Sequence, residues 1–516
     1  MCNRQMPPPR PGSTRCCAPK AFSNRAARPT RAWRSPKRIS PAPRPPSPAR
    51  LRRSASAEPP LPTFDGPRAQ GAGRCLPTTG GENSPNGKAL PFCALGSAVS
   101  VCLKNPKLTF GYTEMTQMPN VHDAEPIPEA ARAEIDRLLL SGDLFRYTAP
   151  QDAPVALLER EFAALLGTKY ALAVSSCSAA LFLSLKALDL PRDARVLIPG
   201  FTFAAVPSSV VHADCVPVLC EVGENYRIDM ADFKARLDDV QAVIVSHMRG
   251  HTSDMDAILS LCAARDIPVV EDAAHSLGTL WHGEKIGTLG RVGCFSFQSY
   301  KMVNAGEGGI LVTDDADLVA RAVIMSGAYE HNWAKHVDGD DPALSEAFAR
   351  WQNKLPLYNL RLSNLSAAVI RPQLPLLAER VRRGLENHDY VADKLNSSPV
   401  LSVPAPLVAE TRAPDSIQFN LVGLSDDEVT RFAEAAAARG IKVQIFGKSA
   451  DNARAFWNWQ FLPGGAPELP RTRDMLMRAC DVRLPVRLTR DELDLIANAL
   501  LAAAAEVQGP LRVYGT

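Results

Sequence analysis

The chain has 516 residues with a hydrophobic fraction of 46%, so two or more globular domains with sizeable cores are expected. No apolar run approaches the roughly 20 residues that a membrane-spanning helix needs, which argues against an integral membrane protein. The net charge of +3 conceals an asymmetry, because residues 1–110 carry 19 Lys and Arg against 3 acidic residues. The remainder therefore has an excess of about a dozen acids, which disfavours nucleic-acid binding by the folded part.

Pro, Arg, Ser and Ala dominate the start of the chain, in stretches such as PPPRPG and RRSASAEPPLP. This composition cannot bury enough apolar surface to offset the entropy lost on ordering, so we predict a disordered, basic leader over residues 1–114. Three interpretations of the leader stay open. It is an organelle transit peptide, a basic nucleic-acid-binding tail, or an upstream extension from a misplaced start, with Met115 or Met118 as the true beginning.

The 12 cysteines are scattered, about half of them in the leader, and those of the body show no Cys-x-x-Cys or Cys/His ligand spacing. Several fall in apolar segments, where a free thiol behaves as a small hydrophobe. We therefore expect no metal site and a reducing, cytoplasmic location, or an organelle if the leader is a transit peptide.

After residue 126, short apolar runs alternate with helical segments. Helical spacing predicts helices over 128–141, 157–166, 179–188, 204–212, 230–237 and 255–265. Predicted strands occupy 170–175, 195–199, 217–222, 241–247, 267–272, 292–297 and 309–313. Such short strands, bounded by turn residues and separated by helices, predict a large α/β domain over 127–375, with a mostly parallel sheet covered on both faces.

The C-terminal part mixes strands and helices in a different pattern. A long helical stretch after Leu362 leads into it, and we predict a second, smaller α+β domain over 376–510. Its expected strands are 417–422 and 442–446, and its expected helices are 427–439 and 490–507. The apolar-aromatic stretch AFWNWQFLPG (455–464) either walls a pocket or belongs to the core, and we favour the core.

Ligands of open parallel sheets bind beyond the carboxyl ends of the strands, where three candidate groups fall: 176–178, Asp272 and 296–301. Taken singly, Ser178 is an ordinary N-cap, Asp272 a helix cap and Lys301 a surface lysine. Together they match pyridoxal phosphate, which needs a lysine for its aldehyde, an acid for its ring nitrogen, and backbone N–H groups at a helix N-terminus for its phosphate. Glycine-rich dinucleotide and P-loop signatures are missing from the strand ends.

From about Ile127 to Val507 the chain resembles the DegT/StrS-like sugar aminotransferases, which are fold-type I pyridoxal phosphate enzymes. The resemblance is carried by ordered motifs: SSCSAAL, IPGFTFAA, VVEDAAHSLG, FSFQSYK, GEGG and YNLRLSNLSAA. It implies that Lys301 is the catalytic residue, linked to the cofactor's aldehyde, and that Asp272 pairs with the pyridine nitrogen. The further implied cofactor contacts are Ser178, Ala179 and Ser296 at the phosphate, Phe203 stacked on the ring, His275 near its 3-hydroxyl, and Asn359 at the phosphate of the neighbouring subunit. The last contact implies a homodimer with shared sites.

The chain departs from the family pattern in two places. The phosphate motif reads Ser176-Cys177-Ser178, where the family commonly has Ser-Gly-Thr. The segment SHMRGHTSDM makes Arg249 and His251 candidate substrate contacts, although a solvated arginine is an equal reading. The stretch GDLFRYT (142–148) is a further candidate for contact with the sugar.

The resemblance implies amino transfer from glutamate or glutamine to a nucleotide-linked or free keto-sugar, in polysaccharide, lipopolysaccharide or secondary-metabolite synthesis. A dehydratase branch of the family has histidine in place of the lysine, so Lys301 argues for transamination. A non-catalytic regulator or scaffold with this fold is the alternative, which the intact Lys301, Asp272 and Ser296 disfavour. No nucleic acid or membrane is expected as a partner.

Overall fold

The computed structural model describes residues 117–149, 152–337 and 339–508, so the leader predicted over 1–114 lies outside the described residues. In these ranges, no helix is long and apolar enough to cross a membrane. The cysteines in the same ranges are buried and free of disulfides: Cys177, Cys215, Cys220, Cys262, Cys294 and Cys480.

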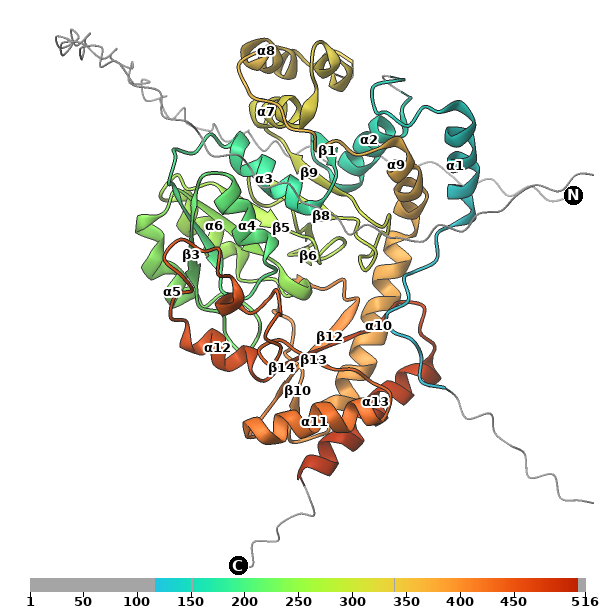
Figure 1. The fold of residues 1–516 in the computed structure, drawn as a ribbon, viewed down its shortest axis with the longest axis vertical. Coiled ribbons are helices and arrows are strands. Elements are labelled where there is room, and N and C mark those ends of the chain that lie inside the picture. The colour runs from blue at the N-terminus through green and yellow to red at the C-terminus, as the bar shows by residue number, and fades with distance from the viewer. Residues whose placement is uncertain (1–116, 150–151, 338, 509–516) are drawn as a thin grey trace, which may run out of the picture. The chain divides into compact units, whose positions relative to one another are not determined.

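A seven-stranded sheet in the order β1-β9-β8-β5-β4-β2-β3 forms the centre of the fold (Figure 1). Its strands are β1 Tyr170–Val174, β2 Arg195–Pro199, β3 Val216–Cys220, β4 Ala242–Ser246, β5 Val269–Asp272, β8 Val292–Ser296 and β9 Gly309–Thr313. Neighbouring strands are parallel except at β9, which runs antiparallel to both β1 and β8. The predicted α/β class with a mostly parallel sheet is confirmed.

Helices cover both faces of this large sheet. They are α1 Glu129–Ser141, α2 Pro154–Leu166, α3 Cys177–Ala187, α4 Ala205–His212, α5 Met230–Arg236, α6 Met255–Ala263, α7 Ala316–Gly327, α8 Pro342–Trp351 and α9 Asn364–Ile370. Strand residues alternate between the two resulting cores. Val196 and Ile198 pack with side chains of α3, α4 and α7, whereas Leu197 packs with those of α2, α5 and α6. The sequence analysis did not predict α7 or α8.

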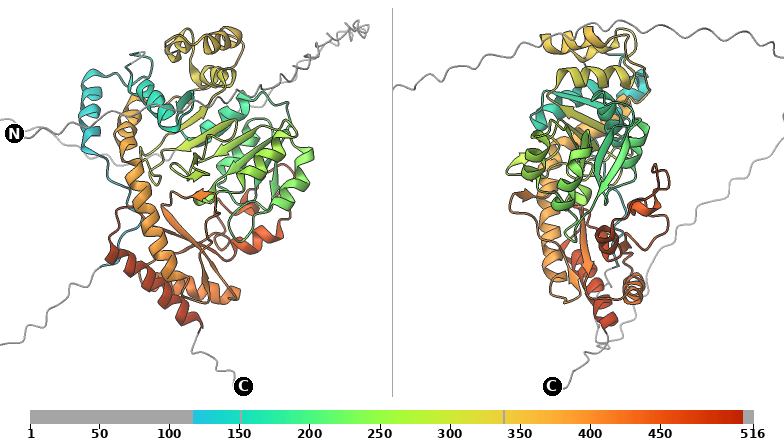
Figure 2. Two further views of the ribbon diagram at one scale, coloured as in Figure 1. Left: turned by 180° about the vertical axis from the view of Figure 1, so that it is seen from behind. Right: turned by 90° about the vertical axis from the view of Figure 1, so that its left-hand side faces the viewer.

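A second sheet, with the order β10-β12-β14-β13, is antiparallel throughout. Its strands are β10 Leu401–Ser402, β12 Ser416–Leu421, β13 Gln444–Ile445 and β14 Ala479–Arg483, and the accompanying helices are α10 Leu377–Leu395, α11 Asp426–Ala438, α12 Pro470–Leu476 and α13 Arg490–Gln508. Helices α10, α11 and α13 supply a third core with β12 and β14 (Figure 2). We call this antiparallel sheet the small sheet.

Two connections join the small sheet to the large one. The long helical stretch predicted after Leu362 is interrupted by a 3-10 segment, Arg371–Leu376, in which Pro372 and Pro375 disturb the α-helical hydrogen bonding. A three-stranded sheet pairs β11 Glu410–Thr411 with the hairpin of β6 Leu280–Trp281 and β7 Glu284–Lys285. In the stretch 455–464, Phe456 and Trp459 are buried in the same core as Val196 and Ile198. This placement agrees with the prediction that the stretch belongs to the core.

Candidate active site

The carboxyl ends of neighbouring strands bring the predicted groups to one edge of the large sheet. Strand β4 ends at Ser246, β5 at Asp272 and β8 at Ser296, while β1 leads directly into the start of α3. A cavity of about 440 Å³, which we call the inner cavity, lies at this edge. Its lining includes Ser176, Cys177, Ser178, Phe203, Asp272, His275, Ser296, Gln298, Tyr300, Lys301, Glu307 and Arg454.

Lys301 is held in a tight turn that follows β8. Its backbone N–H donates to the Gln298 carbonyl (2.9 Å), and the Gln298 side chain accepts from the Tyr300 N–H (3.1 Å). The side-chain nitrogen of Lys301 lies 2.8 Å from Nε2 of His275. Burial lowers the pKa of Lys301 to about 7, although the negative charge of Asp415 opposes the shift. A large fraction of the amine is therefore neutral near pH 7 and can act as a nucleophile or a base.

Asp272 is buried beside the inner cavity and is held by donors from the neighbouring strand β4 and from the turn that follows β5. Ser246 Oγ donates to its Oδ2 (2.7 Å), and the Ala274 N–H donates to its Oδ1 (3.2 Å). Thr202 Oγ1 in turn donates to Ser246 Oγ (2.8 Å). The sequence analysis did not identify Ser246. Strands β4 and β5 pair with Ser246 opposite Asp272, so the contact follows from the order of the strands in the sheet. The result is a carboxylate with a fixed orientation.

The N-terminus of α3 opens into the same cavity. Ser176 is the N-cap, and its hydroxyl oxygen accepts from the Ala179 N–H (3.0 Å), so that backbone donor is already paired. Ser178 is exposed on the first turn and lines the cavity together with Ser296. A Cβ on Gly309 would lie 2.2 Å from the Ser176 carbonyl carbon, so only glycine allows β9 to approach the helix start this closely. A helix N-terminus favours an anion.

Two further predicted cofactor contacts, Phe203 and Asn359, differ in whether they line the inner cavity. Phe203 lines the inner cavity with 44% of its surface exposed, and the Arg454 guanidinium lies 5.6 Å from its ring centre. Asn359 is exposed and does not line the described cavity of its own chain. Its segment runs beside the end of β1, where the Ser175 N–H donates to the Leu360 carbonyl (2.8 Å).

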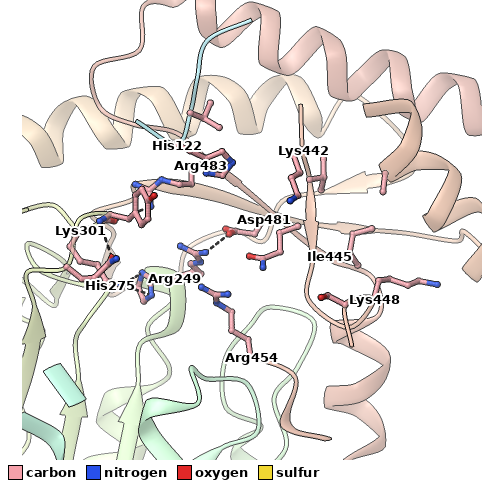
Figure 3. A pocket seen from close by; sticks show the side chains of 17 residues that line it. His122, Arg249, His275, Lys301, Lys442, Ile445, Lys448, Arg454, Asp481 and Arg483 are labelled. Atoms are coloured by element: carbon pink, nitrogen blue, oxygen red, sulfur yellow. Dashed lines mark hydrogen bonds and ion pairs between the residues drawn. The ribbon is translucent and has the colours of Figure 1, made fainter. Parts of the chain in front are cut away.

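A second cavity of about 570 Å³, which we call the outer cleft, continues from Lys301 toward the small sheet (Figure 3). Its lining shares His275, Gln298, Tyr300, Lys301 and Arg454 with the inner cavity and adds charged side chains from the small sheet and its loops: Lys442, Lys448, Asp481 and Arg483. Arg454, Asp481 and Arg483 were not predicted, because no local pattern marks them.

The two candidate substrate contacts separate in the structure. Arg249 lines the outer cleft and forms an ion pair with Asp481, with Nη2 2.5 Å from Oδ2. His251 is buried, and its Nε2 lies 2.9 Å from the Gln418 side-chain oxygen, so it does not reach the cleft. Two consecutive left-handed residues, Arg249 (φ +55°) and Gly250 (φ +82°), precede His251. In the stretch 142–148, the side chains likewise line neither cavity.

The inner cavity fits pyridoxal phosphate. It places an amine of lowered pKa, a fixed carboxylate and a helix N-terminus around one space, which are the groups that an aldehyde, a pyridine nitrogen and a phosphate require. When bound, this cofactor supplies a ring that withdraws electrons from the substrate carbon. Across the described ranges, no group of three or more His, Cys, Asp or Glu side chains is arranged to hold a metal ion.

Comparisons with known proteins agree with this chemistry. The spore coat polysaccharide biosynthesis protein SpsC of Bacillus subtilis (strain 168) is 34% identical over 233 residues, which cover 44% of this chain and 58% of that protein. The L-glutamine:scyllo-inosose aminotransferase of Streptomyces griseus is 31% identical over 293 residues, 54% of this chain and 67% of that protein. The solved structure of the aminotransferase from Psychrobacter cryohalolentis matches with a TM-score of 0.63 at 25% identity, over 75% of this chain and 100% of that one.

The model of the DegT/DnrJ/EryC1/StrS aminotransferase family matches residues 137–501. The match includes both sheets and every residue of the inner cavity named above. The chain therefore belongs to the DegT/DnrJ/EryC1/StrS aminotransferase family, whose members are pyridoxal phosphate-dependent enzymes.

Proposed function

We propose that this chain transfers the amino group of glutamate or glutamine to a keto-sugar, for amino-sugar synthesis in a polysaccharide, a lipopolysaccharide or a secondary metabolite. The observation that carries the proposal is the half-buried amine of Lys301, which faces both the inner cavity and the outer cleft. A lysine in this position can reach a cofactor on one side and a substrate on the other. The names of the two relatives, one in polysaccharide synthesis and one using L-glutamine, support the same class of reaction.

Each side chain has a defined task in this proposal. Lys301 is the catalytic residue, and its Nζ would take the proton from the donor's α-carbon and deliver it to the cofactor's aldehyde carbon. Asp272 keeps a proton on the pyridine nitrogen. The remaining proposed cofactor contacts are Ser178, Phe203, His275 and Ser296, with Asn359 contributed by a partner subunit. Ala179 is also a proposed contact, and its N–H would exchange the Ser176 hydroxyl for the phosphate. Arg249 is the proposed substrate contact, and His251 is linked to it only indirectly, through Gln418 and Asp481.

The charge of the outer cleft supports an acceptor that carries negative charge. Lys442, Lys448 and Arg483 line the part that is nearer the small sheet, with His122 at its rim (Figure 3). Asp481 is the one carboxylate among the described lining residues, and Arg249 neutralises it. A nucleotide-linked keto-sugar or a keto-sugar acid would place phosphate or carboxylate oxygens among these cations.

A homodimer with shared sites belongs to the same proposal. The exposed rings of Phe145 and Tyr329 stack on one another with centroids 6.5 Å apart, and Leu357 is 49% exposed. The Arg361 guanidinium lies over both rings, two residues from Asn359. A second copy of the chain would cover this apolar surface and bring Asn359 to its cofactor phosphate. We also propose domain boundaries at 127–375 and 376–510, and a cytoplasmic location.

A spectroscopic assay tests the proposed function. The purified protein should be yellow with bound pyridoxal phosphate and should lose that colour when glutamate or glutamine is added, and a suitable keto-sugar should restore it. The acceptor panel comprises nucleotide-linked keto-sugars, free keto-sugar acids and an uncharged keto-inositol. Lys301→Ala should remain folded but show no colour change with donor. A protein that binds the cofactor but never bleaches would instead support the non-catalytic scaffold.

A further inference from the structure

Arg249 differs from the other cations of the outer cleft in its backbone. Its φ of +55° and ψ of 25° lie in the left-handed region, which costs a non-glycine residue about 1–2 kcal/mol. Hydrogen bonds on either side hold this conformation. The His247 N–H donates to the Asp272 carbonyl (3.0 Å), and the Gly250 N–H donates to the His247 carbonyl (3.0 Å). Strain of this kind persists where the resulting geometry serves function.

The side chain of Arg249 is fixed by a chain of polar contacts but retains unused donors. Its Nη2 donates to Asp481 Oδ2 (2.5 Å), while the Gln418 amide donates to Asp481 Oδ1 (2.7 Å). Arg249 is 8% exposed and Asp481 4%. A guanidinium has five N–H donors, and Nε of Arg249 has no hydrogen-bond partner among the residues that the structure describes. Asp481 therefore orients Arg249 without satisfying it.

A second arginine, Arg454, lies near Arg249 in the outer cleft (Figure 3). It lines both cavities, and Figure 3 shows its side chain directed toward Arg249. Its Nε is also buried without a hydrogen-bond partner within the described ranges. Burial, together with the positive charge of Arg249, lowers the pKa of Arg454 to about 10. Two guanidinium groups thus share one carboxylate, Asp481, and an incoming anion would relieve their repulsion.

We propose that Arg249, oriented by Asp481 and assisted by Arg454, binds the α-carboxylate of the amino donor. The inference rests on the proposed function. An α-amino acid carries its carboxylate on the carbon that loses a proton to Lys301, so a cation in the same cleft is placed for that group. A keto-sugar has a hydroxyl-bearing carbon next to its reacting carbon. Arg249 therefore distinguishes the donor from the acceptor by the group next to the reacting carbon. Asp481, which orients Arg249, is a positioning residue.

The test compares glutamine with glutamine α-amide, in which the side chain is the same and only the α-carboxylate is replaced by an amide. In the wild-type holoenzyme, kcat/KM of the donor half-reaction should be about 100-fold higher for glutamine, as expected for a charged pair with hydrogen bonds. Arg249→Met should lower the glutamine value about 100-fold and leave the value for the α-amide nearly unchanged. This non-additivity identifies a direct contact, because each change removes one half of the same pair.

Control variants separate this contact from general charge and from misfolding. Lys448→Met removes a positive charge from the outer part of the same cleft and should leave the discrimination between the two donors unchanged. Asp481→Asn should reduce the discrimination about tenfold, because Arg249 loses its orienting partner. Arg249→Lys keeps the charge without the planar fork and should also reduce it partly, so it serves if Arg249→Met does not fold.

The possible outcomes are distinct. The inference is overturned, while the proposed function stands, if cofactor-loaded Arg249→Met discriminates between the two donors as strongly as the wild type does. The same conclusion follows if both Arg249→Lys and Asp481→Asn keep the full discrimination. A wild-type protein that reacts with no α-amino acid overturns the proposed function, and the inference with it. An equal loss of discrimination in Lys448→Met would show that the effect is one of overall charge and would also overturn the assigned contact.

Discussion

The side-chain nitrogen of Lys301 lies 2.8 Å from Nε2 of His275, at the junction of the inner cavity and the outer cleft. His275 follows β5 and Lys301 follows β8, and these strands are neighbours in the sheet, so the contact follows from strand pairing. Burial, together with the positive charge of Lys301, holds the pKa of His275 well below its usual value. A neutral imidazole beside the amine leaves Lys301 free to gain and lose a proton near neutral pH.

The lowered pKa of Lys301 predicts a specific pH dependence in the cofactor-free protein. The folded-state pKa of about 7 lies below the ordinary lysine value, so the neutral amine is present from about pH 7 upward and disappears as the pH falls through 7. Capture of pyridoxal phosphate, trapped by borohydride and mapped to Lys301 by mass spectrometry, should rise about tenfold from pH 6 to pH 8 and then level off.

A variant of Asp415 supplies the control for this pH profile. The negative charge of Asp415 favours the protonated form of Lys301, so Asp415→Asn should move the midpoint to lower pH. An ordinary lysine would give a rate that still rises steeply beyond pH 8. A profile of that form, or a midpoint that Asp415→Asn leaves in place, would show that burial does not control this amine.

Asp272→Asn should retain the cofactor but slow the donor half-reaction by about two or more orders of magnitude, because a neutral amide cannot keep the ring nitrogen protonated. Ser246→Ala removes one donor to the same carboxylate and should slow it by about tenfold or less. Rapid-mixing absorbance with glutamate measures both rates. Equal rates in wild type and Asp272→Asn would mean that another acid pairs with the ring.

Gly309→Ala should weaken cofactor binding at least tenfold, because the new Cβ would lie 2.2 Å from the Ser176 carbonyl carbon and displace the start of α3. Gly223→Ala is the matched control, since its Cβ would meet only the end of the Asn225 side chain, at 3.2 Å. Fluorescence titration of the cofactor-free proteins with pyridoxal phosphate gives the two affinities. Unchanged affinity in Gly309→Ala would place the phosphate elsewhere.

Much of the fold and part of the site follow from the sequence, because both depend on local patterns. Short apolar runs between helices specify a parallel sheet, and residues at the ends of adjacent strands, such as Asp272 and Ser296, must then lie together. Helix boundaries were predicted to within a few residues where a cap was visible, as at Gly142 and Gly167. The family motifs supplied the roles of these residues, which the pattern alone did not.

The outer cleft could not be predicted, because its contacts join distant parts of the chain. Arg249 and Asp481 are separated by 232 positions, and their pairing depends on how the small sheet packs against the large one. The placement of His251 shows a second limit. It lies two residues from Arg249, yet Arg249 and Gly250 both have left-handed backbone conformations, and no periodicity indicates that conformation at an arginine.

The proposed sharing of sites between subunits predicts complementation between two inactive variants. Lys301→Ala lacks the catalytic amine, and Asn359→Asp places a carboxylate against the phosphate of the partner's cofactor. If Asn359 serves the neighbouring subunit, a mixed dimer has one site with both changes and one with neither. Cofactor binding and dimerisation would then be linked, since the complete site exists only in the assembled protein.

Subunit exchange between the two purified variants tests this directly. An equal mixture at exchange equilibrium should regain about one quarter of wild-type activity, because half of the dimers are mixed and each has one intact site of two. Native mass spectrometry of differently tagged subunits verifies the exchange. If Asn359 acts within its own subunit, where its segment lies beside the end of β1, each site of a mixed dimer carries one change. The mixture would then stay inactive despite complete exchange, and the shared site would be refuted.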